Sequence, residues 1–185
     1  MKIALFFGSF NPIHIGHLAI AQHILNETDT ERILFIVSPQ NPLKTADELI
    51  SAEKRLEMLN LSIADHPDFE VSDIEFTLEK PSYTYLTLRA LRAKFPDDEL
   101  QILMGSDTLE QLPLWKHSEE ILNYPILVYQ RSKDITNPYP SHQGITILET
   151  PLLHISATRI RLMLKENKEI KYLVRDEIIN LLKFS

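Results

Sequence analysis

Residues 3–18 decide the fold, and they read Ile3-Ala4-Leu5-Phe6-Phe7-Gly8-Ser9-Phe10-Asn11-Pro12-Ile13-His14-Ile15-Gly16-His17-Leu18. The apolar run over 3–7 predicts a strand buried on both faces, as in a parallel sheet. Gly8 ends this strand, and because glycine has no Cβ we expect a backbone or a ligand to approach closely there. Apolar residues recur at helical spacing from His17 onward, so a helix begins near Gly16. The stretch therefore predicts a strand, a polar turn and a helix start in direct succession.

This succession places two imidazoles, His14 and His17, at the carboxyl end of a strand. Open α/β sheets bind ligands at that end, and the unpaired N–H groups of a helix N-terminus favour anions. Three interpretations of the pair are open: buried structural histidines, a zinc site, or donors to a phosphate, which are stronger when protonated. Zinc needs a third ligand, and no carboxylate cluster lies in this segment. The position of the pair favours the phosphate.

Strands and helices alternate along the rest of the chain. The pattern predicts strands over 32–37, 69–71, 74–78, 100–104, 125–129 and 145–148, and helices over 17–27, 52–63, 83–94, 118–122, 157–165 and 175–184, with short helix and loop over 109–115. Ser51, Ser82 and Ser156 are the expected N-caps. This order predicts a doubly wound, mainly parallel α/β sheet with helices on both faces. No repeat or linker divides the sequence, so we expect residues 1–185 to form a single domain.

The composition argues against several classes of protein. There is no cysteine, which excludes disulfides, thiolate nucleophiles and cysteine metal sites. The formal net charge of −7 argues against a nucleic-acid partner, because a phosphate backbone requires clustered cations. The sequence has neither a signal-peptide pattern nor an apolar run of about 20 residues, so we expect a cytoplasmic protein without a membrane partner. The oligomeric state is not readable from the sequence.

Residues 8–17 resemble the signature of the HxGH nucleotidylyltransferases. The match includes the glycine, the aromatic residue, the proline and both histidines. Near the other end, Ile155-Ser156-Ala157-Thr158-Arg159-Ile160-Arg161 is similar to the ISSTxIR motif of the same family, with Ala157 in place of the second serine. The resemblance implies a Rossmann-like nucleotidylyltransferase fold in which residues 156–185 form a helical part that completes an ATP site.

The family resemblance implies transfer of a nucleotidyl group from ATP to a substrate phosphate, with release of pyrophosphate. His14, His17, Arg161 and Lys44 are the catalytic residues that it implies, and they would stabilise the charge that develops on the phosphates. Mg²⁺ would arrive with ATP, with no metal ligands from protein side chains. The residues expected to contact ATP are Gly8, Ser9, Phe10, His17, Gly105, Asp107, Ile155, Ser156, Thr158 and Arg161. The roles of Arg131 and Arg159 stay open.

The middle of the chain resembles the nicotinate mononucleotide adenylyltransferases of this family. Residues 38–44 are similar to their loop that ends in PPHK, 82–88 to their SYTxxTL segment and 105–116 to their GxDxxxxLxxWK segment. Asn41 and Leu43 depart from the first of these patterns, and the proline and glycine that follow the family's strand-end arginine are missing after Arg131. The implied product is nicotinate adenine dinucleotide, within NAD biosynthesis.

The residues that the resemblance assigns to nicotinate mononucleotide are Lys44, Thr84, Tyr85 and Trp115. A pyridine ring favours an aromatic face, and Trp115 is the only tryptophan. The alternatives are the same chemistry on nicotinamide mononucleotide or on another phosphorylated acceptor such as phosphopantetheine, a non-catalytic nucleotide-binding module, and a metal hydrolase that uses His14 and His17.

Overall fold

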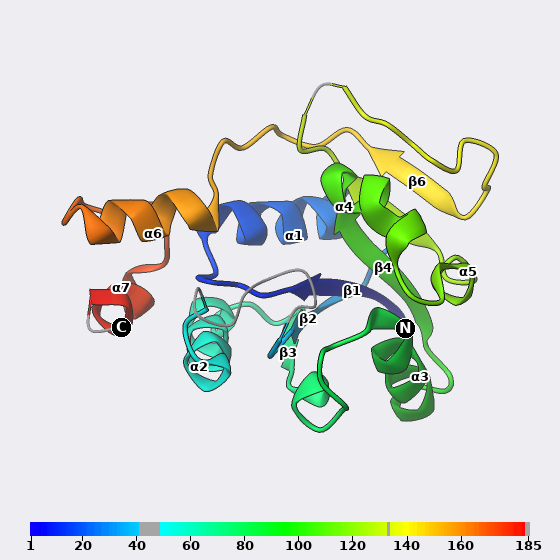
Figure 1. Cartoon of the computed structure of the whole chain (residues 1–185), viewed down its shortest axis with the longest axis horizontal. Helices are drawn as coiled ribbons and strands as arrows, with labels where there is room; N and C mark the ends of the chain where they lie inside the picture. Colours follow the sequence, from blue (N-terminus) through cyan, green and yellow to red (C-terminus); the bar gives the residue numbers. More distant parts are fainter. Residues whose placement is uncertain (41–48, 133, 184–185) are drawn as a thin grey trace.

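A computed structural model describes residues 1–40, 49–132 and 134–183 (Figure 1). Its centre is a sheet of six strands in the order β3-β2-β1-β4-β5-β6. Every neighbouring pair is parallel. The strands are β1 (Lys2–Gly8), β2 (Arg32–Val37), β3 (Phe69–Ser72), β4 (Glu99–Gly105), β5 (Ile126–Tyr129) and β6 (Ile145–Leu148). The order reverses between β1 and β4, so their carboxyl ends flank the switch point of the sheet.

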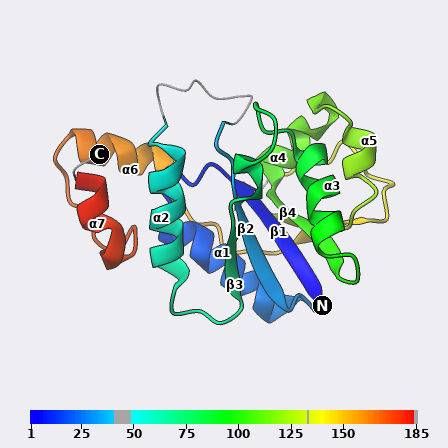
Figure 2. The ribbon, with the colours of Figure 1, turned by 90° about the horizontal axis from the view of Figure 1, so that it is seen from below.

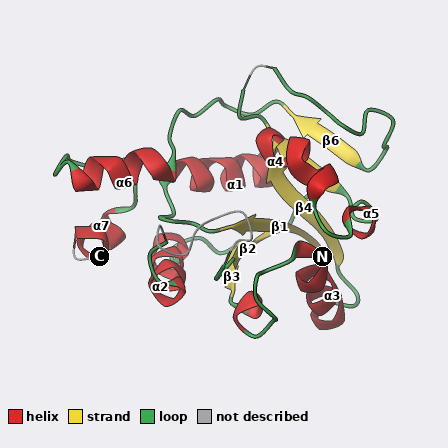
Figure 3. Cartoon of the chain, viewed as in Figure 1, coloured by secondary structure: helices red, strands yellow, loops and turns green. Residues whose placement is uncertain are grey.

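Helices cover both faces of this sheet. They are α1 (Ile15–Glu27), α2 (Ala52–Ile63), α3 (Thr84–Lys94), α4 (Ser106–Gln111), α5 (Ser118–Ile121), α6 (Ala157–Lys165) and α7 (Asp176–Lys183), with short 3₁₀ helices η2 (Ile74–Phe76) and η3 (Leu112–Leu114). Figure 2 shows α1, α2, α6 and α7 on one side of the strands and α3, α4 and α5 on the other. Figure 3 shows the alternation of strand and helix along the chain. The predicted doubly wound parallel sheet is confirmed.

The two faces of β1 enter two different hydrophobic cores. Ala4 and Phe6 join the core that the residues of α1, α2, α6 and α7 form. Ile3 and Leu5 join the core under α3, α4 and α5. All four residues are at most 2% exposed. An apolar run without alternation is what a strand covered on both faces requires, because each successive side chain enters the opposite core.

The C-terminal helix α7 packs against α2 (Figure 1). Ile178 and Leu182 on α7 are buried in the same core as Met58 and Leu59 on α2. Just before α7, Arg175 Nη2 lies 2.7 Å from a carboxylate oxygen of Asp65, which follows α2. The C-terminal helices thus share a core with the first half of the sheet.

Two local predictions are wrong. The expected strand over 74–78 is the 3₁₀ helix η2, whose backbone bonds are local: Phe76 N–H donates to Asp73 O at 2.8 Å and Thr77 N–H to Ile74 O at 3.2 Å. Alternating apolar and polar residues usually indicate a strand with one buried face. Here the polar residue Glu75 is buried, while its apolar neighbours Ile74 and Phe76 are only partly buried. Ser82 does not cap α3: Tyr83 is the N-cap residue, and the Ser82 N–H donates to Gln40 O at 3.0 Å.

Other boundaries differ by less. α1 begins at Ile15, two residues before its expected start. Ser51 and Ser156 are the N-caps of α2 and α6, and their hydroxyls accept hydrogen bonds from Lys54 N–H and Arg159 N–H. The predicted end of the last helix at 184 lies outside the described residues. Within the described ranges, no helix combines the length and the apolar character needed to cross a membrane.

Candidate active site

A cleft of about 710 Å³ lies at the carboxyl ends of β1 and β4. Its walls come from segments far apart in the sequence: the turn after β1, the starts of α1, α3 and α6, the α4–η3 region and the end of β5. Parallel strands all point their carboxyl ends to one edge, so the loops that follow β1, β4 and β5 meet there. The candidate site is therefore built by topology and not by neighbours in sequence.

His14 and His17 both line this cleft. His14 is the N-cap residue of α1, and His17 lies in its first turn. Their rings stack with centroids 3.7 Å apart. The backbone N–H of His14 donates to His17 Nδ1 at 3.3 Å, so a neutral His17 ring carries its proton on Nε2. The backbone thereby sets the tautomer of His17 before any ligand arrives.

His14 is more deeply buried than its partner, with 3% of its surface exposed. Burial, followed by the positive charge of Arg131, lowers the pKa of His14 to about 4. His14 is therefore neutral at pH 7 in this structure. Its Nδ1 is buried without a hydrogen-bond partner among the described residues. A neutral imidazole still donates one hydrogen bond.

The C-terminal motif reaches the same cleft as the histidines. Ser156, Thr158 and Arg161 line it, although about 140 residues separate them from His14 and His17. Arg161 Nη1 donates to the backbone oxygen of Asn11 at 2.8 Å, which joins α6 to the turn after β1. Its Nη2 lies 3.4 Å from Thr158 Oγ1. The two ends of the chain therefore converge on one site.

The turn after β1 brings Gly8, Ser9 and Phe10 to the cleft wall. A Cβ at Gly8 would lie 2.8 Å from Phe10 Cζ. The close approach expected at Gly8 is thus made by the Phe10 ring. Phe10 itself has φ 44° and is 3% exposed, and its ring packs edge-on against Phe6 and His17 at 5.7 and 5.2 Å. The hydroxyl of Ser9 is buried and has no partner in the described structure.

Gly105 and Asp107 form the β4 side of the cleft. A Cβ at Gly105 would collide with Asp107 Oδ1 and come within 3.2 Å of the side chains of Arg131 and Tyr129. Arg131 Nε lies 3.8 Å from Asp107 Oδ1, and the Arg131 backbone N–H donates to Ser106 Oγ at 3.1 Å. A side chain at position 105 would therefore require the Asp107 carboxylate to move away from its present place beside Arg131.

Arg131 lines the cleft, although sequence reasoning left its role open. Its position in the sequence indicates this place, since only Gln130 separates Arg131 from the carboxyl end of β5. Tyr83 and Lys116 also line the cleft, although the sequence did not indicate them as site residues. Lys116 Nζ lies 4.2 Å from the centre of the Tyr83 ring. These three residues add two cations and an aromatic ring to the predicted set.

The opposite end of the cleft is formed by Tyr83, Thr84, Trp115 and Lys116. Trp115 is half-buried, and its Nε1–H is buried without a partner in the part of the chain that the structure describes. Thr84 is the first residue of α3, so the unpaired N–H groups of this helix start face the same end. An aromatic ring beside a helix N-terminus suits a flat ligand that carries a negative charge.

Two expected site residues lie outside the main cleft, and a third falls on residues that the structure does not describe. Tyr85 is not among the lining residues, and its ring packs against His117 and Arg89, with centroid distances of 4.4 and 5.2 Å. Ile155 lines a smaller hollow of about 20 Å³ beside the histidines. Lys44 lies outside the described residues. Tyr83, the N-cap residue of α3, lines the cleft, whereas Tyr85 in the first turn of the same helix does not.

The charge of the cleft is opposite to that of the whole chain. The formal net charge is −7, yet among the described residues the charged ones that line the cleft are Lys116, Arg131, Arg161 and one carboxylate, Asp107. The first turns of α1, α3 and α6 add partial positive charge at the same place. Clustered cations at the base of a cleft attract anions even on an acidic protein. The site is therefore suited to a ligand with several phosphates.

No group of three histidine, cysteine, aspartate or glutamate side chains lies close enough to hold a metal ion within the described ranges. A zinc site on His14 and His17 consequently has no third ligand there. Among the residues that the structure describes, Asp107 is the one carboxylate on the cleft wall. These side chains fit a cation that a polyphosphate carries rather than one held in a protein cage.

A parallel sheet in this strand order, with a cation-lined cleft at its switch point, is typical of α/β proteins that bind nucleotides. The chain belongs to the cytidylyltransferase-like family, whose model matches residues 5–163. It is 43% identical over 183 residues to a protein of Cytophaga hutchinsonii named probable nicotinate-nucleotide adenylyltransferase, covering 98% of this chain and 95% of that protein. A protein of Flavobacterium psychrophilum with the same name is 44% identical over 181 residues, covering 96% and 94%.

Solved structures have the same fold. The nicotinic acid mononucleotide adenylyltransferase of Plasmodium falciparum, complexed with NaAD, superposes with a TM-score of 0.80 over 100% of this chain and 98% of that one, at 19% identity. A nicotinate-nucleotide adenylyltransferase of Vibrio parahaemolyticus, described as putative, superposes with a TM-score of 0.71 at 22% identity, over 98% and 99% of the two chains. At these identities the likeness shows the fold alone.

Proposed function

We propose that this protein transfers the adenylyl group of ATP to nicotinate mononucleotide, forming nicotinate adenine dinucleotide and pyrophosphate in NAD biosynthesis. The observation that carries the proposal is the set of residues that line the cleft at the carboxyl ends of β1 and β4. Its β1–α6 end gathers hydrogen-bond donors suited to phosphates, and its α3–η3 end has Trp115 beside a helix N-terminus. Relatives that are 43% and 44% identical carry the name of this activity.

The reaction is an in-line displacement at phosphorus. A phosphate oxygen of nicotinate mononucleotide forms a bond to the α-phosphorus of ATP, and the bond from that phosphorus to the bridging oxygen of the β-phosphate breaks. The electron pair leaves with pyrophosphate. No protein nucleophile takes part, so the protein contributes positioning and stabilisation of charge.

Three side chains carry the charge stabilisation in this proposal. His17 donates from Nε2 to the triphosphate, and neutral His14 donates one hydrogen bond beside it. Arg161, oriented by Asn11 O and Thr158 Oγ1, supplies the positive charge. Arg131 is a fourth candidate, because its guanidinium faces the same space. Each of these contacts gains strength as negative charge spreads over the departing pyrophosphate.

The remaining ATP contacts follow the walls of the cleft. Gly105 and Asp107 lie where an acidic residue can accept from a ribose hydroxyl, and the Asp107 carboxylate is 60% exposed. Ser156 and Thr158 at the start of α6 can hold phosphate oxygens, although the Ser156 hydroxyl also caps the helix. Gly8, Ser9 and Phe10 shape the turn. Lys44 keeps its proposed role toward the acceptor phosphate.

A divalent cation accompanies ATP in nucleotidyltransferases of this class, and we propose that it is Mg²⁺. Bound to the triphosphate, it would neutralise part of the phosphate charge and polarise the α-phosphorus. Its ligands would be phosphate oxygens and water, with none from protein side chains. We expect the reaction in the cytoplasm, where ATP is abundant, with no nucleic-acid or membrane partner.

The acceptor binds at the α3–η3 end in this proposal. Trp115 stacks on the pyridine ring, and the Thr84 side chain and backbone N–H groups bind its carboxylate. Tyr83 takes the position first proposed for Tyr85, because its ring faces the cleft. Lys116, held over the Tyr83 ring, adds a positive charge at the same end.

The decisive experiment measures pyrophosphate release with ATP and Mg²⁺ in the presence of nicotinate mononucleotide or nicotinamide mononucleotide. We expect turnover with the nicotinate form and at least about 10-fold lower kcat/KM with the amide, since the amide lacks the charge that the helix start favours. Mass spectrometry should identify nicotinate adenine dinucleotide. A preference for the amide would overturn the acceptor assignment, and absence of pyrophosphate with every mononucleotide would favour a binding module.

A further inference from the structure

Arg55 on α2 is completely buried, with 0% of its surface exposed. It does not line the cleft. Its guanidinium donates to four backbone carbonyls: Nε to Ile50 O at 2.8 Å, Nη1 to Ser9 O at 2.6 Å and Ser38 O at 2.8 Å, and Nη2 to Pro39 O at 2.9 Å. Within the described ranges it makes no ion pair. Burying a positive charge is costly, so hydrogen bonds from Arg55 to these main-chain oxygens call for a structural reason.

These carbonyls belong to two loops at the edge of the active-site cleft. Ser9 follows β1, in the turn that leads to the histidine pair, and Ser38 follows β2. Both residues line the cleft. The Ser38 N–H also donates to Gly8 O at 3.0 Å, which joins the two loops directly. The guanidinium therefore bridges the loop of the nucleotide end to the loop that precedes residues 41–48.

The same turn is attached to α2 and α6 by further bonds. The Ile50 N–H donates to Asn11 Oδ1 at 3.0 Å, and Asn11 O accepts from Arg161 at 2.8 Å. Arg161 is one of the proposed charge-stabilising residues. Hydrogen bonds thus connect Arg55 through the β1 turn to a side chain that faces the phosphates. A displacement of this turn would move His14, His17 and Asn11 together.

The chemistry of the guanidinium explains why arginine is needed. The carbonyls after β1 and β2 have left the sheet ladder, and a buried carbonyl requires a donor. A planar guanidinium offers five N–H groups in a rigid fork, so it binds several oxygens and also holds them at set distances from one another. Lysine offers three donors on a flexible chain and cannot impose that geometry.

We propose that Arg55 is a positioning residue for the transfer reaction, which fixes the β1 turn against the loop after β2 and so sets the alignment of the two ends of the cleft. It contacts neither substrate. The proposal rests on the proposed function, because alignment matters only if two substrates must meet in line. A misplacement of about 1 Å can lower the rate of such a reaction about 100-fold.

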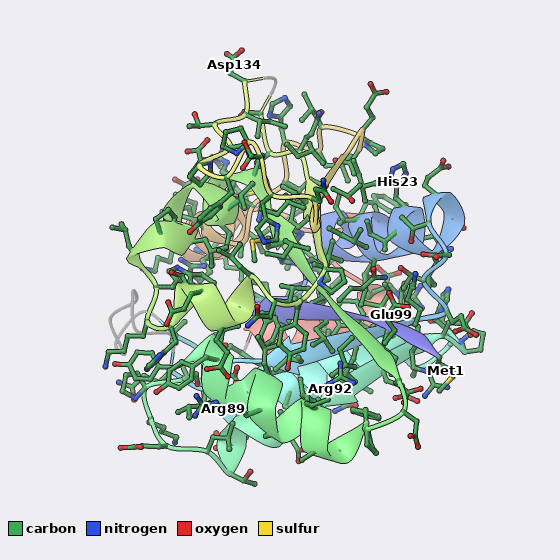
Figure 4. All side chains as sticks on the ribbon, turned by 90° about the vertical axis from the view of Figure 1, so that its right-hand side faces the viewer. Met1, His23, Arg89, Arg92, Glu99 and Asp134 are labelled. Carbon is green, nitrogen blue, oxygen red and sulfur yellow. The ribbon has the colours of Figure 1, made fainter. Side chains whose placement is uncertain are left out.

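The test compares Arg55→Lys and Arg55→Ala with a matched pair, Arg92→Lys and Arg92→Ala. Arg92 on α3 also donates to backbone carbonyls, with Nη1 2.7 Å from Asp98 O and 3.4 Å from Phe95 O. Figure 4 shows it near Met1 and Glu99, at the edge of the sheet where the strands begin. The variants at both positions are expected to lose stability. Only the variants at Arg55 are expected to lose the alignment of the two ends of the cleft.

We expect Arg55→Lys to lower kcat about 100-fold while the calorimetric Kd for Mg²⁺–ATP changes less than about 5-fold. Arg92→Lys should keep kcat within about 3-fold of wild type at a comparable loss of melting temperature. Added guanidinium ion should restore part of the activity of Arg55→Ala. In amide hydrogen exchange, residues 8–11 and Ser38 should lose protection selectively in Arg55→Lys, which reports on the loops even without turnover.

The proposal is overturned if folded Arg55→Lys retains kcat within about 3-fold of wild type, or if Arg92→Lys loses as much. It is equally overturned if Arg55→Lys shows no selective exchange in the two loops. Wild-type turnover with nicotinate mononucleotide tests the proposed function separately. If the wild type uses another mononucleotide, kcat of each variant relative to wild type is measured with that acceptor. A failure of the proposed function is thereby distinguished from a failure of the proposal for Arg55.

Discussion

His14 and His17 stack on one another, but their surroundings give them different properties. His14 is buried beneath the turn, and His17 is half-buried with its Nδ1 accepting from the backbone. A spacing of three residues at a helix start places both rings on one side of the helix. His14 is the more deeply buried ring of the pair, and burial lowers its pKa so that it carries no charge at neutral pH.

The lowered pKa of His14 predicts a pH dependence of folding stability. The folded state holds this ring neutral down to about pH 4, while the unfolded chain protonates it below about 6.5. The unfolded state therefore binds more protons between these values, and stability falls as the pH decreases through that window, by roughly 3 kcal/mol in total. In His14→Asn, denaturant unfolding at pH 6.5 and 4.5 should show a smaller loss than in wild type.

His23 on the same helix provides the control for that measurement. It is half-buried on the outer side of α1 (Figure 4), and its Nε2 lies 2.9 Å from Glu149 O. His23→Asn makes the same replacement on the same helix at a residue that does not line the cleft, so it controls for the loss of an imidazole as such. If His14→Asn and wild type lose the same stability, the ring is not held neutral in the folded state.

His17→Ala should lower kcat much more than it weakens ATP binding. A donor that strengthens as charge develops in the transition state is worth about 100-fold or more in rate. We expect kcat from pyrophosphate release to fall by that factor, with the calorimetric Kd for Mg²⁺–ATP changed only a few-fold. Unchanged turnover in this variant would remove His17 from the reaction.

Trp115→Ala should act on the other substrate. Loss of a stacked aromatic ring costs about 10-fold in affinity for a planar ligand. We expect KM for nicotinate mononucleotide to rise by about that factor while KM for ATP stays within about 2-fold. An unchanged KM for the mononucleotide would place the pyridine ring away from Trp115.

At the scale of the element, the start of α3 is held by a buried acid on η2. Glu75 is 2% exposed, and its Oε1 accepts from the Thr87 hydroxyl at 2.8 Å. Burial raises the pKa of Glu75, while the hydroxyls of Thr87, Ser38 and Ser82 act against the increase. This contact replaces the Ser82 cap that the sequence suggested. It fixes the first turn of α3, where Thr84 faces the cleft.

The raised pKa of Glu75 predicts a second pH effect, of opposite sign to that of His14. The folded state binds this proton more tightly than the unfolded chain, whose carboxyl has the ordinary value of 4.5. Stability is therefore highest below pH 4.5 as far as Glu75 is concerned, and it declines as the pH rises toward the folded pKa. Glu75→Gln removes this decline, so the stability of the variant relative to wild type should increase from pH 5 to pH 8.

Denaturant unfolding at the two pH values measures that difference. Thr87→Val is the matched variant, because it removes the hydroxyl donor and keeps the titratable group. Its stability relative to wild type should not increase from pH 5 to pH 8. A Glu75→Gln difference that is independent of pH would contradict a raised pKa for the buried Glu75 carboxyl.

At the scale of the whole molecule, the C-terminal helices share one core with the first half of the sheet. Trp115 packs against the other core, under α3, α4 and α5. If residues 1–185 unfold as one domain, a cavity at Ile178 on α7 should shift the fluorescence transition of Trp115. Ile178 is fully buried, so Ile178→Ala should cost about 2–5 kcal/mol.

Denaturant unfolding followed by Trp115 fluorescence and by far-UV circular dichroism tests this coupling. We expect both midpoints to shift by the same amount in Ile178→Ala, as in a two-state transition. A fluorescence midpoint that stays at the wild-type value would show that residues 156–185 unfold separately. In that case the predicted single domain would be wrong.

The sequence alone determined the class of fold and most of the residues that meet in the cleft. The uninterrupted apolar run of β1 could only belong to a strand covered on both faces, and the glycine, histidine and Ser156–Arg161 patterns are local features of helix starts. Local patterns survive folding because they depend on chain stereochemistry and on hydrogen bonds between near neighbours. The convergence of His14, His17 and Arg161 then followed from parallel topology.

Only the tertiary structure decided the rest, because burial depends on residues that are distant in sequence. It made His14 neutral, turned Tyr83 rather than Tyr85 toward the cleft, and buried Glu75 within what looked like an alternating strand. It also placed Arg55 among the carbonyls of two loops. Periodicity reports which side of an element is apolar, but the partner that a polar group meets inside the molecule is set by packing.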